Sequence, residues 1–215
     1  MGTLTREVIL GTSTLAELRS LEVEGVEGRE LEVEEVTHIL KLCDALWLHS
    51  GEALAPHAEL TSGKCSDGFV DTLRALRFTN ICGILGEQMV EQFGKHGLGS
   101  QRIDWVIGSD HAGADFSHSV ATILNAQHDF TEKGPDKQQL WKRFTIEPDE
   151  AVLQVEELIT TTGTLQAVRK GIREGNPHPV KFVPMVGTLV HRSDVYEFEG
   201  FPIVYLAHYN IKVWE

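Results

Sequence analysis

Apolar residues recur at helical spacing in two stretches of the first half of the chain. Within residues 31–47 they fall on one face of a helix with 3.6 residues per turn, at Val36, Ile39, Leu40, Cys43, Leu46 and Trp47. A second helix is predicted for residues 78–93, and Gly94 and Gly97 follow it as stop signals. The intervening stretch is rich in glycine and proline, which predicts turns.

The second half alternates strand-like runs with helical patterns. Strands are predicted at residues 103–109, 127–133, 151–158, 180–190 and 201–209. Helices are predicted at residues 112–125 and 165–175, and a polar loop at 134–143. Strand, loop and helix in succession imply parallel pairing through right-handed crossovers. We therefore expect an α/β fold, a mainly parallel twisted sheet flanked by helices on both faces.

Residues 1–30 form an acidic N-terminal extension in which Glu alternates with Val and Leu. That pattern is compatible with an edge hairpin or with a loosely held extension. No repeat, low-complexity tract or linker divides the rest, so residues 31–215 are expected to form one domain.

Composition excludes several classes of protein. The formal net charge of −13 argues against a nucleic-acid binder, which needs an excess of Lys and Arg. No apolar run approaches the roughly 20 residues needed to cross a bilayer, and no secretory signal is evident, so we expect a cytoplasmic protein without a membrane partner. The three cysteines are far apart and predicted to be free thiols.

Residues 151–175 carry the most informative chemistry. A predicted strand ends in two adjacent acids, Glu156 and Glu157, and a loop of threonines and one glycine then opens into a helix. Such a loop offers backbone N–H groups, hydroxyls and the positive end of a helix dipole to a phosphate. Adjacent carboxylates are suited to accept hydrogen bonds from ribose hydroxyls.

This segment resembles the motif with which type I phosphoribosyltransferases bind phosphoribosyl pyrophosphate (PRPP). The resemblance implies that Glu156 and Glu157 face the ribose, and that the 5′-phosphate is held by Thr160, Thr161, Thr162, Gly163 and Thr164. The sequence departs from the family pattern in its Glu-Glu pair and in Thr162, which stands where glycine is common. The alternative interpretation is an ordinary strand–turn–helix unit with a solvated acidic pair.

Residues 105–124 resemble the pyrophosphate loop of the same family. By that match the pyrophosphate is lined by backbone N–H groups of Ser109, Asp110, His111, Ala112 and Gly113. Two alternatives stay open. His111, Asp115 and His118 could ligate a metal from one helical face, or the polar residues could merely cap a helix.

Residues 129–144 resemble the catalytic loop of orotate phosphoribosyltransferases, a strand end followed by a mobile basic loop. Four cations gather there in an otherwise acidic chain: Lys133, Lys137, Lys142 and Arg143. They could stabilise the charge that develops on departing pyrophosphate. The alternative is a solvated surface loop.

Two further segments resemble the base-binding parts of orotate enzymes. An N-terminal hood, mainly residues 31–75 with the core at about 76–215, would contact the base through Ser62, Gly63, Lys64, Ser66 and Phe69. Arg192 follows a predicted strand where such enzymes place an arginine against orotate. The resemblance covers about residues 33–210.

The resemblance implies transfer of the phosphoribosyl group from PRPP to orotate in pyrimidine biosynthesis. It implies magnesium as cofactor, bound through PRPP without direct protein ligands, and a homodimer whose basic loops reach the neighbouring site. Two other functions stay open: a phosphoribosyltransferase for another base, and a PRPP-binding regulator with little activity.

Overall fold

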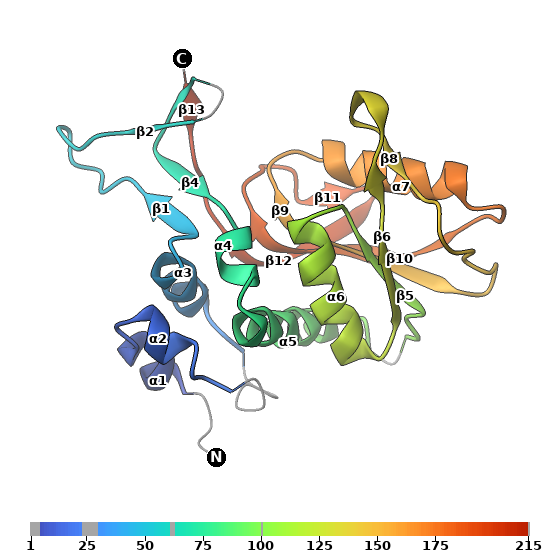
Figure 1. The fold of residues 1–215 in the computed structure, drawn as a ribbon, viewed down its shortest axis with the longest axis horizontal. Coiled ribbons are helices and arrows are strands. Elements are labelled where there is room, and N and C mark those ends of the chain that lie inside the picture. The colour runs from blue at the N-terminus through green and yellow to red at the C-terminus, as the bar shows by residue number, and fades with distance from the viewer. Residues whose placement is uncertain (1–4, 23–29, 61–62, 100, 215) are drawn as a thin grey trace.

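A six-stranded sheet forms the centre of the molecule (Figure 1). The computed structural model describes residues 5–22, 30–60, 63–99 and 101–214. The sheet order is β11-β12-β10-β9-β5-β6. Five strands pair in parallel, and β11 (Glu197–Phe198) adds an antiparallel edge. The parallel strands are β5 (Trp105–Gly108), β6 (Gln127–Phe130), β9 (Ala151–Ile159), β10 (Lys181–His191) and β12 (Phe201–His208). The mainly parallel sheet predicted from the alternating pattern is confirmed.

Helices cover both faces of this sheet, as Figure 1 shows. On one face lie α3 (Val33–Leu42), α5 (Thr79–Lys95) and α6 (Ala112–Leu124), and on the other lies α7 (Gly163–Gly175). Successive residues of β9 point to opposite faces. Leu153 joins the large core beneath α5 and α6, whereas Val152 joins a second core against α7. Burial on both faces explains why the strands read as continuous apolar runs.

The first predicted helix is too long at its C-terminal end. Helix α3 stops at Leu42, and Asp44 takes a left-handed φ of 54°. Residues Leu46–Leu48 instead form strand β1, which pairs with β4 (Gly68–Val70). Leu46 and Trp47 continue the apolar spacing of the helix, but both residues belong to strand β1. The second predicted helix, α5, is confirmed.

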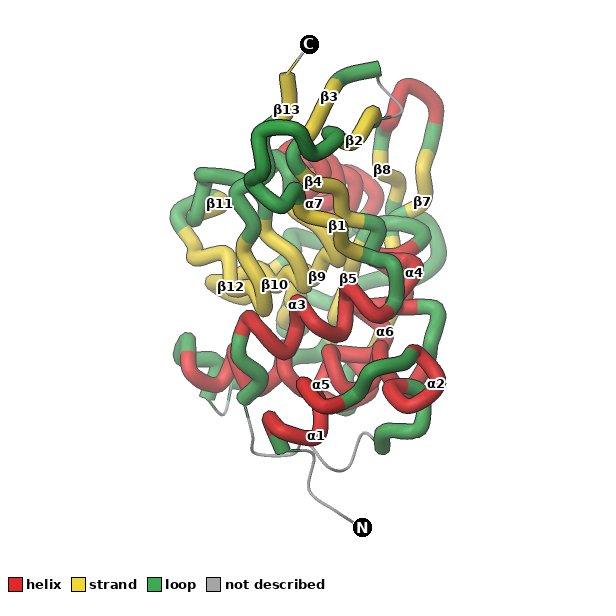
Figure 2. The backbone as a smooth tube through the Cα atoms, turned by 90° about the vertical axis from the view of Figure 1, so that its left-hand side faces the viewer, coloured by secondary structure: helices red, strands yellow, loops and turns green. Residues whose placement is uncertain are grey.

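The hood combines strands from the first third of the chain with a strand near residue 214. Strands β2 (Ala58–Glu59) and β3 (Cys65–Ser66) form a hairpin, and β13 (Val213–Trp214) pairs with the other edge of β3. Helix α4 (Leu73–Leu76) then leads into the core. Figure 2 shows these strands gathered at one end of the molecule, above α3 and α5.

Residues 5–22 form helices rather than strands. They are α1 (Arg6–Gly11) and α2 (Leu15–Leu18), and the side chains of Ile9 and Leu18 are fully buried in the large core. Part of the Glu-rich alternation lies in residues 23–29, outside the described residues, so the choice between hairpin and loose extension there stays a prediction.

The predicted loop at 134–143 contains regular structure. Strand β7 (Glu132–Lys133) pairs with β8 (Gln139–Leu140) around a 3₁₀ turn, η2 (Pro135–Lys137). Trp141 and Ile146 are then buried against α7. The expectation of a polar loop throughout is therefore wrong for its second half, because the buried indole of Trp141 anchors it.

None of the helices in the described part of the chain is long and apolar enough to cross a membrane.

Candidate active site

The acidic pair at the end of β9 meets the loop after β5. Glu156 is almost fully buried, and its Oε2 accepts hydrogen bonds from the backbone N–H of Ser109 (3.2 Å) and from the Ser109 hydroxyl (2.6 Å). A Cβ placed on Gly113 would lie 3.0 Å from a carboxylate oxygen of both Glu156 and Glu157. Two segments that lie more than 40 residues apart in the sequence thus converge at the carboxyl ends of neighbouring strands, where open α/β sheets bind ligands.

Burial is the main influence on this pair. It raises the pKa of both Glu156 and Glu157, because a buried carboxyl group loses hydration that favours its charge. The charge of Glu156 raises the pKa of Glu157 further, and Asp110 raises both pKa values. Hydrogen bonds from Ser109 and Gln154 oppose the rise at Glu156. The free protein therefore holds protons on this pair in a pH range where exposed glutamates are ionised.

The threonine loop opens to solvent at the start of α7. Thr160, Thr161 and Thr164 are exposed, and Thr162 occupies the N-cap position of α7. The nearest atom to a Cβ placed on Gly163 would be the Thr161 hydroxyl oxygen, at 3.5 Å. The N–H groups of the first helical turn have no partner inside the helix. Hydroxyls and N–H groups can thus converge on one anion here.

Close packing requires a glycine before the pyrophosphate-loop segment, residues 109–113. A Cβ on Gly108 would lie 2.6 Å from the Gly113 carbonyl oxygen and 2.7 Å from that of Val155. His111 is exposed at φ 62° and ψ −122°, a conformation that non-glycine residues rarely adopt. Such backbone strain often marks functional loops. Ala112 and Gly113, both buried, begin α6.

The alternative metal site on α6 finds no support. In the described residues, no three His, Cys, Asp or Glu side chains are grouped so that they could hold a metal ion. His118 instead packs edge-on against His128, whose Nε2 lies 2.9 Å from the Ser117 hydroxyl. A groove of about 580 Å³ between α4, α5 and α6 includes Asp115 and His118, but neither glutamate of the acidic pair.

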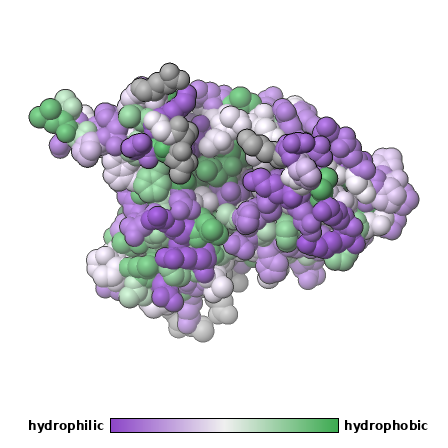
Figure 3. All heavy atoms as spheres, turned by 45° about the horizontal axis from the view of Figure 1, so that its top comes forward, coloured by the Kyte–Doolittle hydropathy of each residue, from purple (hydrophilic) through white to green (hydrophobic). Residues whose placement is uncertain are grey.

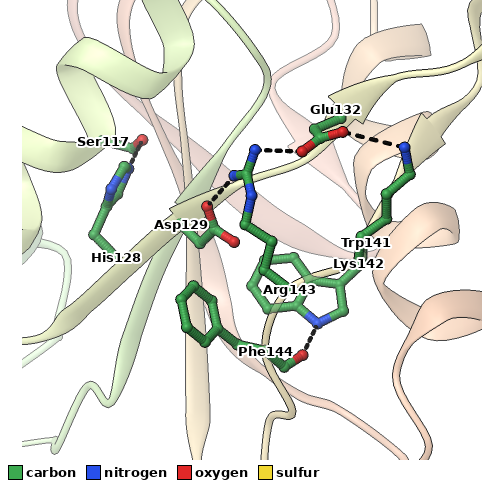
Figure 4. Close-up of polar contacts among 8 residues, drawn as sticks. All are labelled: Ser117, His128, Asp129, Glu132, Trp141, Lys142, Arg143 and Phe144. Atoms are coloured by element: carbon green, nitrogen blue, oxygen red, sulfur yellow. Dashed lines mark hydrogen bonds and ion pairs between the residues drawn. The ribbon is translucent and has the colours of Figure 1, made fainter.

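Two cations of residues 129–144, the basic segment, are held in ion pairs (Figure 4). Arg143 donates to Asp129, at 3.1 Å, and to Glu132, and Lys142 lies 3.1 Å from the other oxygen of Glu132. The guanidinium of Arg143 also stacks 5.0 Å from the centre of the Phe130 ring. Beneath it, the Trp141 indole donates to the Phe144 carbonyl, at 2.6 Å. The structure thus anchors Lys142 and Arg143 beside β6.

The other two predicted cations lie at the tip of this hairpin. Lys133 is exposed on β7, and the backbone of Lys137 closes the turn η2. The side chain of Lys137 is outside the described part of the structure.

The predicted base-binding residues lie in the hood and at the end of β10. Ser62 falls outside the described residues, whereas Gly63 (φ 77°) and Lys64 are exposed at the tip of the β2–β3 hairpin. Ser66 is fully buried, with its hydroxyl 2.6 Å from the Gly68 carbonyl oxygen and 2.9 Å from that of Lys212. That hydroxyl thus links the start of β4 to the segment that precedes β13. Phe69 is half-buried opposite Trp47.

Arg192 follows β10 directly and is half-buried. Burial lowers its pKa, and the charge of Asp67, between β3 and β4, partly opposes that shift. Its Nε is buried and finds no hydrogen-bond partner within the described structure. The surface is hollowed near the middle of the face shown in Figure 3, and hydrophobic residues are visible in the hollow. Gln154 contacts Glu156, and Arg169 contacts Gln154 in turn. Neither was predicted, because single polar residues in a strand or helix carry no motif.

Comparisons with known proteins agree with this geometry. No family model matches the chain. Orotate phosphoribosyltransferase of Caldanaerobacter subterraneus subsp. tengcongensis is 30% identical over 159 residues, 74% of this chain and 79% of that protein. The enzyme of the same name from Caldicellulosiruptor saccharolyticus is 30% identical over 162 residues, 75% and 80% of the two chains.

A solved structure supports the fold independently. The crystal structure of orotate phosphoribosyltransferase from Aeropyrum pernix matches with a TM-score of 0.58 at 19% identity, over 80% of this chain and 93% of that one. The predicted type I phosphoribosyltransferase fold is therefore confirmed. With sequence relatives at 30% identity over most of both chains, this protein belongs to the orotate phosphoribosyltransferase family.

Proposed function

We propose that this protein transfers the 5-phosphoribosyl group of PRPP to orotate. A bond forms between C1 of the ribose and a ring nitrogen of orotate, and the bond from C1 to the pyrophosphate oxygen breaks. The products are orotidine 5′-monophosphate and pyrophosphate. The observation that carries this proposal is the contact of Ser109 and Gly113 with the acidic pair, on a strand that leads into the threonine loop, in a chain of this family.

Different residues are proposed to bind the phosphate, the pyrophosphate and the ribose of PRPP. The threonine loop at the start of α7 takes the 5′-phosphate, because hydroxyls, N–H groups and the helix dipole all favour a dianion there. Residues 109–113 take the pyrophosphate. Glu156 and Glu157 accept hydrogen bonds from the ribose hydroxyls between these two anion sites. Positioning the reactants in this way lowers the barrier without a strong base.

The residues also fit magnesium bound through PRPP. The charge of Asp110 raises the pKa of both Glu156 and Glu157, and the charge of Glu156 raises the pKa of Glu157 further. A divalent cation nearby would relieve that repulsion. Carboxylate and phosphate oxygens are the ligands that Mg²⁺ prefers, and it commonly binds with few protein ligands. When bound, magnesium would supply charge neutralisation at the pyrophosphate.

Arg192 is proposed to select the base. Its guanidinium is partly desolvated and has an unpaired Nε, so a planar carboxylate in the hollow would complete its hydrogen bonding. Orotate has such a carboxylate, whereas purine bases and uracil do not. Gly63, Lys64, Ser66 and Phe69 of the hood are proposed to contact the base as well.

Lys133, Lys137, Lys142 and Arg143 are proposed to stabilise the charge on departing pyrophosphate. Lys142 and Arg143 would have to leave Glu132 and Asp129 to do so, which makes the ion pairs of Figure 4 the resting state of the segment. The protein is further proposed to act as a cytoplasmic homodimer in which this segment reaches the neighbouring site.

A panel of bases tests the proposal. The protein is mixed with magnesium and PRPP, and pyrophosphate release is followed with orotate, uracil, adenine or hypoxanthine. Release with orotate alone is expected, and Arg192→Ala should abolish it while PRPP binding by calorimetry persists. Turnover with a purine would refute the choice of orotate, and PRPP binding without turnover on any base would favour a regulator.

A further inference from the structure

A chain of buried polar side chains begins at Glu156 and runs away from the ligand-facing surface. The second oxygen of Glu156, Oε1, lies 3.3 Å from Nε2 of Gln154, two residues earlier on β9. The other end of that amide, Oε1 of Gln154, accepts a hydrogen bond from Nε of Arg169 at 3.2 Å. Gln154 is fully buried and Arg169 is 1% exposed.

Arg169 occupies a place where an apolar residue would be less costly to bury. Its guanidinium lies between the rings of Phe182 and Phe198, 4.5 Å and 4.8 Å from their centres. Nη1 donates to Glu199 at 2.7 Å, whereas Nη2 is buried and finds no hydrogen-bond partner in the described structure. Burying a charge is costly, and well-packed hydrophobic replacements of such groups are often neutral or stabilising. Core packing alone therefore does not account for this arginine.

The pairing of donors with acceptors favours one orientation of the Gln154 amide. A guanidinium can only donate, so Arg169 requires the oxygen of the Gln154 amide to face it. The amide nitrogen is then directed towards Glu156 and the Leu165 carbonyl oxygen, 3.4 Å away. Without Arg169, only the longer contacts of the amide nitrogen with Glu156 (3.3 Å) and the Leu165 carbonyl oxygen (3.4 Å) keep this orientation. A turned amide would present its oxygen to Glu156 and repel the carboxylate, so Arg169 stabilises the orientation in which Glu156 receives a donor.

We propose that Arg169 is a positioning residue that, through Gln154, fixes the orientation of the Glu156 carboxylate in the ribose site. This inference rests on the proposed function for its effect on PRPP, but its effect on Glu156 exists in the free protein as well. Glu199 anchors the arginine from the opposite side, at the turn between β11 and β12.

The main experiment compares Arg169→Met with Arg173→Met. Arg173 binds the same Glu199 through two hydrogen bonds, but it is about half exposed, and within the described structure no hydrogen bond joins it to Gln154. Dissociation constants for magnesium-PRPP are measured by calorimetry as a function of pH. Arg169→Met is expected to weaken binding roughly tenfold, as loss of a buried partner commonly does, and to move the pH midpoint upward. Arg173→Met should leave both within about twofold of the wild type.

Two further variants protect the test against simple loss of folding. Gln154→Leu should reproduce the shifted pH midpoint, and the double variant should add little, because both changes break one pathway. Arg169→Lys should restore part of the effect, since an ammonium can still donate to Gln154. A melting temperature lowered by Arg169→Met with an unchanged pH midpoint would overturn the proposal, because that result describes a purely structural arginine.

A ligand-free measurement separates this proposal from the proposed function. Titration of carboxyl-labelled glutamate by NMR reports Glu156 directly in the free protein. Arg169→Met should shift that titration upward, and Arg173→Met should not. If the wild type bound no PRPP, the proposed function would fail while this titration still decided the role of Arg169. An unchanged Glu156 titration in Arg169→Met would refute that role.

Discussion

Glu156 and Glu157 link the chemistry of the site to the stability of the whole chain. Both carboxyl groups have a pKa raised above the ordinary value of 4.5, chiefly by burial and then by neighbouring charge. In the unfolded chain they ionise near that ordinary value. Between the two values the folded state binds more protons than the unfolded state, so stability must fall as the pH rises through this range.

The first prediction is that the free energy of unfolding decreases from pH 4.5 towards neutral pH, and that Glu156→Gln flattens this decrease. One proton of difference corresponds to about 1.4 kcal/mol per pH unit. The amide cannot ionise, and it also relieves the repulsion that raises the pKa of Glu157. Urea unfolding at several pH values measures the slope. Glu174→Gln, a change at an exposed glutamate of α7, is the control and should keep the wild-type slope.

Helix α7 positions the threonine loop at one end and the basic segment along its side. The backbone of residues 139–141 runs so close to α7 that only glycines are tolerated there. A Cβ on Gly171 would lie 2.1 Å from the Gln139 carbonyl oxygen, and one on Gly175 would lie 2.4 Å from that of Trp141. Both neighbours are backbone atoms, which cannot rotate away as a side chain could. The two glycines thus allow residues 139–141 to pack directly against α7, which fixes the position of the basic segment.

The second prediction is that Gly171→Ala destabilises the protein by about 1–3 kcal/mol, the usual result of overpacking. The helix would have to move away from β8, so turnover should fall as the basic segment loses its anchor. Gly94→Ala is the matched control, because it also lies in a helix but has no atom within 4 Å of an added Cβ. That control should be neutral or slightly stabilising. Equal stability of the two variants by thermal unfolding would contradict the close packing.

Sequence patterns identified these elements unevenly. Strand β9 and helix α7 were predicted closely, because a buried parallel strand and an amphipathic helix each have a clear period. Strands β1 and β8 were missed, since two or three residues are too few to establish alternation. The convergence of Ser109 with Glu156 followed from parallel pairing, whereas the contact of Arg169 with Gln154 did not. Tertiary packing places that arginine, and no local pattern signals it.

At the scale of the whole molecule, the hood depends on the last residues of the chain. Strand β13 pairs with β3, and the backbone N–H of Lys212 donates to Asp67 at 2.6 Å. The side chain of Ile211 packs where a Cβ of Gly68 would lie, 3.0 Å away. The prediction of a hood mainly within residues 31–75 did not include this strand, because pairing between strands about 150 residues apart leaves no trace in local sequence.

The last prediction is that a chain ending at Asn210 loses affinity for orotate but keeps its affinity for magnesium-PRPP. The truncation removes the Lys212 partners of Asp67 and of the Ser66 hydroxyl, which then keeps only the Gly68 carbonyl oxygen. The segment between β3 and β4 should therefore loosen. The acidic pair and the threonine loop lie on β9 and α7, whose packing does not involve β13. We expect orotate binding to weaken at least roughly tenfold, from the loss of several hydrogen bonds.

Calorimetry with each ligand measures the two affinities separately, and limited proteolysis reports the opening of the hood. Trp214→Ala is the control, because it removes the ring contact with His57 while keeping the backbone pairing of β13 and the Lys212 hydrogen bonds. It should therefore weaken orotate binding much less than truncation does. If truncation weakened PRPP and orotate binding equally, the hood would be supporting the entire core, and the division of the site between hood and sheet would be wrong.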